Sequence, residues 1–87
     1  MITNGQQSVT ATATMIDGRS PKYSRLYIHN EDNTKAVYIG NSSVTVANGY
    51  HLLKEESVEI YLPPLNDLFV ISDGTPHTIS WLRVEVD

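Results

Sequence analysis

Apolar and polar residues alternate along most of this chain, with the period of two that a β-strand requires. The pattern recurs in six segments, at residues 9–15, 26–29, 37–39, 44–46, 58–62 and 82–86. The segment 50–61, YHLLKEESVEIY, has the length of a helix, but Val58, Ile60 and Leu62 alternate along one side of it. We therefore predict strands throughout the chain and no helix.

Turn-forming residues separate these segments. Clusters rich in Gly, Pro, Asn, Asp and Ser occur at residues 17–22, 30–35, 40–43, 47–49, 63–67 and 73–76. These residue types preset a turn or tolerate a positive φ, and the Asn48-Gly49 pair is typical of a type I′ hairpin. About seven or eight short strands at this spacing predict an all-β fold, either a small antiparallel β-sandwich or a jelly-roll-like barrel.

The aliphatic residues that alternate in phase define the predicted core. Its members are Val9, Leu26, Ile28, Val37, Ile39, Val58, Ile60, Leu62, Val70, Leu82 and Val84. Residues 1–7 are mostly polar and include a glycine, so they are predicted to form a flexible N-terminal arm. Residues 8–87 then form a single β-sandwich domain.

A second set of large side chains falls out of phase with this core. It comprises Tyr27, Tyr38, Tyr61, Ile79 and Trp81. The outer face of an isolated antiparallel sandwich is usually polar, whereas tyrosine and tryptophan are enriched at protein interfaces. We predict that these five residues form an interface, either between copies of the chain or with a larger assembly. The alternative is that twist or a bulge turns some of them inward.

Composition and charge exclude several classes of function. The chain has 87 residues, a net charge of −4 and no cysteine, and its six basic residues are scattered. Nucleic-acid binding would require a clustered basic surface, so none is expected. Neither a signal peptide nor an apolar run long enough to cross a membrane is found. A domain this small and without disulfides often gains stability from partner subunits, which favours a homo-oligomer.

Candidate catalytic and metal-binding residues form no recognisable motif. His29, His51 and His77 lie in separate segments without the spacing of a zinc site. Most carboxylates lie in turns, and the sequence 31–33 (Glu-Asp-Asn) lacks the ordered spacing of a calcium loop. Neither a nucleophile elbow nor a phosphate-binding glycine loop occurs. We predict a protein that is not an enzyme, with no catalytic residues, cofactor or metal.

Residues 36–74, AVYIGNSSVTVANGYHLLKEESVEIYLPPLNDLFVISDG, carry hydrophobic and glycine landmarks, and a final LRV follows at residues 82–84. Across residues 8–86 the pattern resembles small β-sandwich virion structural proteins of tailed bacteriophages. The resemblance implies a capsid decoration (cement) protein in the virion, assembled in the host cytoplasm. Its partners would be the major capsid protein or other virion proteins. The alternatives are a tail, fibre or baseplate component, or a carbohydrate-binding module in which Trp81 and the tyrosines stack on sugars.

Overall fold

A computed structural model describes residues 1–17, 20–32, 34–74 and 77–86. These residues form eight β-strands and no helix. The strands are β1 (Ile2–Val9), β2 (Thr14–Met15), β3 (Tyr23–Asn30), β4 (Val37–Gly40), β5 (Tyr50–Leu52), β6 (Ser57–Leu62), β7 (Phe69–Ile71) and β8 (His77–Val86).

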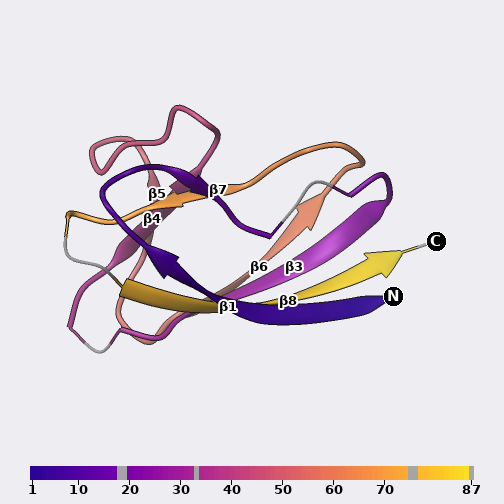
Figure 1. The fold of residues 1–87 in the computed structure, drawn as a ribbon, viewed down its shortest axis with the longest axis horizontal. Coiled ribbons are helices and arrows are strands. Elements are labelled where there is room, and N and C mark those ends of the chain that lie inside the picture. The colour runs from indigo at the N-terminus through magenta and orange to yellow at the C-terminus, as the bar shows by residue number, and fades with distance from the viewer. Residues whose placement is uncertain (18–19, 33, 75–76, 87) are drawn as a thin grey trace.

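The strands form two four-stranded antiparallel sheets that pack face to face (Figure 1). One sheet has the order β1-β8-β3-β6 and is called the long sheet here, and the other, β2-β7-β4-β5, is called the short sheet. Strand β1 pairs with β8, β2 with β7, β3 with β6 and β4 with β5. This is the pattern of one long hairpin rolled into two layers, which is a jelly roll. The predicted fold class is confirmed.

The core lies between the sheets and is built from the inward-facing residues of both. Seven of the residues predicted for it are buried: Val9, Leu26, Ile28, Val37, Ile39, Leu62 and Val70. Val58 and Ile60 are partly buried and pack against this cluster from the edge strand β6. The core also includes Ile16 and Leu52, which the alternation pattern did not identify because they lie at the ends of short segments.

Strand β8 has the opposite phase to the one predicted. Ile79 is fully buried, and Trp81 packs against the core, where its ring covers Gly5 of β1. Leu82, predicted to lie in the core, is 38% exposed on the outer face. Val84, in phase with Leu82, is likewise on the outer face and not in the core cluster. Both faces of β8 carry apolar residues, so alternation fixed its period but not which face points inward.

A buried arginine explains why the inner face of β8 looks polar in sequence. Arg83 is only 4% exposed, and its Nε donates to Asp17 Oδ2 at 2.9 Å. Its Nη1 donates to the hydroxyl of the fully buried Ser24 at 3.0 Å. Because a buried charge is tolerated when it is paired and hydrogen-bonded, Arg83 can point inward at one end of the sandwich.

Two further predictions fail in the structure. Residues 2–7, predicted to be a flexible arm, belong to β1, which pairs with β8 over its whole length. Residues 44–46, predicted to be a strand, lie in the connection between β4 and β5, and Asn48-Gly49 does not form a type I′ turn because neither residue has a positive φ. Gly49 is required for space instead, since a Cβ there would lie 2.7 Å from Tyr38 Cβ.

Candidate functional site

The outer face of the long sheet carries a set of apolar and aromatic side chains on neighbouring strands. Strand register brings them together: Tyr23 lies opposite Val86, Tyr27 opposite Leu82, and Ile2 opposite Val84. The set, called the outer patch here, comprises Ile2, Tyr23, Tyr27, Tyr61, Leu82, Val84 and Val86.

Two tyrosines give the outer patch its most ordered contact. The rings of Tyr23 and Tyr61, from neighbouring strands β3 and β6, stack with centroids 5.5 Å apart. Tyr61 remains 55% exposed and Tyr23 47%. Offset-stacked rings are rigid and present a large apolar surface with a polar tip, which suits them to an interface.

Charge is sparse on this part of the sheet. Arg25 lies between Val84 and Tyr61 in the strand register, and its Nε lies 3.9 Å from Glu59 Oε2 on the next strand. The two charges therefore offset each other across neighbouring rows, since Glu59 lies opposite Tyr27. A cluster of exposed apolar side chains on a protein surface often marks an interaction site.

The five residues predicted to form an interface do not lie together. Tyr27 and Tyr61 belong to the outer patch. Ile79 and Trp81 face the core, so their assignment to an outer face is wrong. Tyr38 lies on the outer face of the short sheet, where it is half-buried and its ring meets His51 edge-on at 4.8 Å.

Sequence reasoning missed five members of the outer patch: Ile2, Tyr23, Leu82, Val84 and Val86. Each failed for an identifiable reason. Leu82 and Val84 were assigned to the core, Val86 was only noted as alternating in phase with them, and Ile2 was assigned to a flexible arm. Tyr23 follows directly on a turn cluster, so no alternation marked it. One feature of the sequence was consistent with the observed phase of β8. His77 and Arg83 alternate in phase with Ile79, and each pairs with a carboxylate from a turn, Asp32 and Asp17 respectively.

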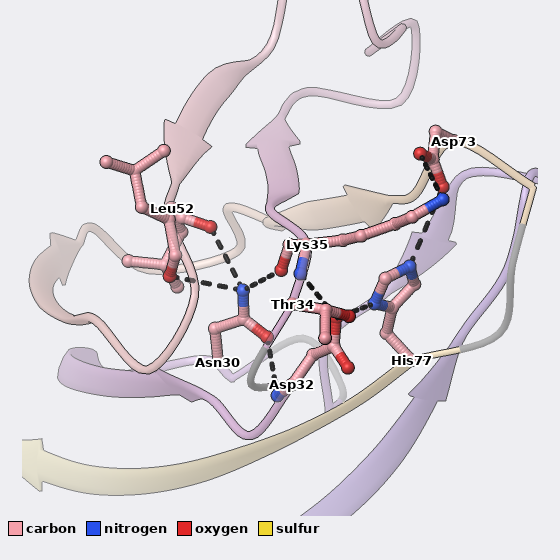
Figure 2. Close-up of polar contacts among 8 residues, drawn as sticks. Asn30, Asp32, Thr34, Lys35, Leu52, Asp73 and His77 are labelled. Carbon is pink, nitrogen blue, oxygen red and sulfur yellow. Dashed lines mark hydrogen bonds and ion pairs between the residues drawn. The ribbon is translucent and has the colours of Figure 1, made fainter.

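A polar network lies at the end of the sandwich where β8 begins, opposite to the end that holds Arg83 (Figure 2). Asn30 of β3 is fully buried, and its Nδ2 donates to the carbonyls of Lys35, Leu52 and Leu53 at 2.9–3.2 Å. Its Oδ1 accepts a hydrogen bond from the backbone N–H of Asp32 at 3.0 Å. Asn30 therefore links the long sheet to the short sheet, because Leu52 belongs to β5.

The same network holds His77 between two carboxylates. Its Nδ1 lies 2.9 Å from Asp32 Oδ2, and its Nε2 lies 3.6 Å from Asp73 Oδ1. An ionised carboxylate only accepts, so the imidazole donates from Nδ1. Lys35 Nζ lies 3.4 Å from Asp73 Oδ2, which extends the network to a lysine. Figure 2 shows these side chains converging from different strands and loops.

The pKa of Asp32 is displaced from its usual value. Desolvation favours the neutral acid, but hydrogen bonds from the Lys35 backbone and the Thr34 hydroxyl oppose it, together with attraction to His77. The hydrogen bonds and the attraction to His77 outweigh desolvation, so the pKa of Asp32 lies below its usual 3.8. In this network the carboxylate is a fixed acceptor that orders a turn. The His77 side chain is 1% exposed, and in the described part of the chain it contacts carboxylates rather than a nucleophile.

The other two histidines lie elsewhere. His29 Nδ1 lies 2.7 Å from the Ser57 hydroxyl on the outer face, and His51 meets Tyr38 on the short sheet. Among the described residues, no group of three His, Cys, Asp or Glu side chains is arranged to hold a metal ion, and no helix could cross a membrane. The candidate calcium segment 31–33 includes Asn33, which is outside the described residues.

Comparisons with known proteins support the fold but not the sequence-based identity. No family model and no curated protein matches the chain. A similar solved structure comes from the Bacillus endospore appendages, described as "a novel family of disulfide-linked pili". It has a TM-score of 0.66 and 16% identity, and the alignment covers 100% of this chain and 87% of that one. At this identity the likeness establishes a shared fold alone.

This likeness contradicts the functional prediction. The similar structure is a bacterial appendage protein, whereas the resemblance led to a bacteriophage capsid decoration protein. The prediction of a capsid decoration protein is wrong. The expected partner, a major capsid protein, and the expected location, a virion, rested on the same resemblance. The landmarks that suggested it are hydrophobic and glycine positions, which any jelly roll of this size needs. The prediction that the protein is not an enzyme stays a prediction.

Proposed function

We propose that the protein is a structural subunit that assembles with copies of itself through the long sheet. The observation that carries this proposal is the outer patch, which leaves Tyr61, Tyr23 and Val86 each more than 40% exposed in an isolated chain. Burying such a surface is favourable at about 25 cal/mol per Å² of apolar area. A second copy supplies the same kind of surface.

The fold of the similar solved structure supports the same role. The Bacillus appendages are pili, so a jelly roll of this size serves there as the building block of a polymer. Those pili are described as disulfide-linked, and this chain contains no cysteine. Covalent linkage by disulfides therefore cannot be transferred to it. The outer patch offers non-covalent contacts for association without disulfides.

Sedimentation velocity over a range of protein concentrations tests the proposal. We expect the average mass of the wild-type protein to rise with concentration, and that of Leu82→Lys to stay near the monomer value. Interface anchors contribute on the order of 2 kcal/mol each, so the association constant should fall at least about 30-fold. Leu82 is exposed, so the variant should keep the β-sheet circular dichroism spectrum of the wild type.

Leu53→Lys is the matched control. Leu53 is 53% exposed, more than Leu82, but it follows β5 of the short sheet. It should associate like the wild type. A wild-type protein that remains monomeric at the highest attainable concentration would contradict the proposal. So would equal loss of association in both variants, because a general charge effect would then explain it.

A further inference from the structure

The edge strands of the long sheet, β1 and β6, each have a single neighbouring strand among the described residues, and their free edges match each other. We propose that strand β1 of one copy pairs with strand β6 of the next, head to tail, so that the long sheet continues from subunit to subunit. This inference rests on the proposed self-association and specifies the contact that would extend it.

Neither edge is protected in the usual ways. Natural sheets block their edges with proline, charge, bulges or very short strands. Strand β1, ITNGQQSV, has eight residues with neither a charge nor a proline. Strand β6, SVEIYL, has six residues, and its one charge, Glu59, lies beside Arg25. The edges of the short sheet, by contrast, are strands of two and three residues.

Strand direction allows a translated copy to fit. Each neighbouring pair in the order β1-β8-β3-β6 is antiparallel. With an even number of strands, the two edges β1 and β6 therefore run in opposite directions. A second copy that is shifted sideways without being turned over presents its β1 antiparallel to β6 of the first copy.

The hydrogen-bonding phase agrees as well. Glu85 N donates to Met1 O at 2.9 Å, so the odd-numbered residues of β1 bond to β8 and the even-numbered ones face the free edge. Asn30 N donates to Glu56 O at 2.9 Å, so the even-numbered residues of β6 bond to β3. The free N–H and C=O groups of β6 are therefore those of Ser57, Glu59 and Tyr61.

The direction of the side chains on the two edge strands also fits this pairing. The residues with free backbone groups carry outward-facing side chains on both edges, because Ile2 lies in the same row as Val84 and Tyr61. A ladder that pairs Tyr61 with Ile2 of the next copy places Glu59 opposite Asn4 and Ser57 opposite Gln6. It joins the outer patches of successive subunits into one apolar band, and it uses all six residues of β6.

The sandwich is also open where the incoming strand would lie. An apolar cleft of about 240 Å³ runs between β6 and the short sheet, lined by Val58 and Ile60 of β6 together with Ile39, Gly40, Tyr50 and Leu68. The side that holds β1 is closed by an amide instead, because Gln7 Nε2 donates to Met15 O at 2.9 Å. Pairing of β1 with β6 covers the cleft. Pairing of β1 with β1 leaves it open, and pairing of β6 with β6 sets two Glu59 carboxylates opposite each other.

Two proline variants test the inference. Asn4→Pro removes an N–H that faces the free edge of β1, and Glu59→Pro removes one that faces the free edge of β6. Neither N–H donates to another of the residues that the structure describes, so both variants should fold, and proline is tolerated on an edge strand. Each should stop growth beyond a dimer at concentrations where the wild type forms larger species by sedimentation velocity. Asn4→Ala and Glu59→Ala are the controls and should assemble as the wild type does.

A mixing experiment then distinguishes the possible pairings. Asn4→Pro leaves β6 intact and Glu59→Pro leaves β1 intact, so an equimolar mixture should form species larger than the dimer to which each variant alone is limited. Full assembly by both variants would overturn the edge pairing while leaving self-association through the outer patch standing. Loss in Asn4→Pro alone would indicate β1–β1 pairing and also overturn it. A monomeric wild type would overturn the proposed function itself.

Discussion

The long and short sheets enclose the same core but treat their outer faces differently. The connection between β4 and β5 folds over the short sheet, where Val44 is buried and packs near Gly40. The same connection brings Gly49 against Tyr38, which explains why this tyrosine is half-buried. No described segment covers the outer patch of the long sheet in this way. One aromatic face is therefore covered by a loop of the same chain, and the other stays exposed.

The edges of the two sheets repeat this contrast. The short sheet ends in strands too short to act as templates, while the long sheet ends in strands of eight and six residues. An aromatic residue on the outer face of a sheet therefore indicates an interface only once the loops around it are known, because a loop can cover it. What marks the long sheet is the combination of a bare apolar face and two unprotected edges on the same layer.

The largest expected effect separates the two faces of β8. Ile79 is fully buried and Leu82 is 38% exposed, so truncating each to alanine tests which face points inward. Ile79→Ala should lower the free energy of unfolding by about 2–5 kcal/mol, because it leaves a cavity in the core. Leu82→Ala should change it by less than about 1 kcal/mol. Urea denaturation of the monomer measures both, and a reversed order would show that β8 has the phase first predicted from its alternation.

A smaller effect is expected on the covered face of the short sheet. A Cβ at position 49 would lie 2.7 Å from Tyr38 Cβ and 3.0 Å from the Thr45 carbonyl oxygen. Gly49→Ala should therefore destabilise the fold by about 1–3 kcal/mol, as overpacking usually does. Val44→Ala removes the Cγ2 that would lie 2.9 Å from the new Cβ, so the double variant with Gly49→Ala should lose less stability in thermal melts than the two single variants added together. If Gly49→Ala alone melts like the wild type, the loop does not pack on this sheet.

The smallest expected effect concerns pH at the polar end of the sandwich. Because the pKa of Asp32 is lower in the folded protein than its usual 3.8, the carboxylate contributes stability above that pH. This contribution is lost as the pH falls through the lowered pKa. The stability difference between wild type and Asp32→Asn should therefore shrink between about pH 5 and pH 2. The surface variant Glu59→Gln serves as a reference, and a difference for Asp32→Asn that is constant with pH would contradict this role.

Much of the fold was predictable because period and punctuation are local properties. Val37 and Ile39 alternate with Tyr38, and Leu26 with Tyr27, so these strands and their buried faces follow from the sequence. The candidate site was less predictable. Tyr27 and Tyr61 were identified, but Leu82 and Val84 were assigned to the core because both faces of β8 are apolar at its centre.

The sequence by itself determined the all-β class, the approximate strand positions and most of the core, since each depends on neighbours two residues apart. Only the tertiary structure decided which face of β8 is buried, because that choice depends on Asp17 and Asp32 reaching Arg83 and His77 from distant turns. It also decided that residues 2–9 form an edge strand and that a loop covers Tyr38. A face of a sheet is a candidate interface only if no loop of the same chain covers it. Whether a loop does so depends on contacts between residues far apart in sequence.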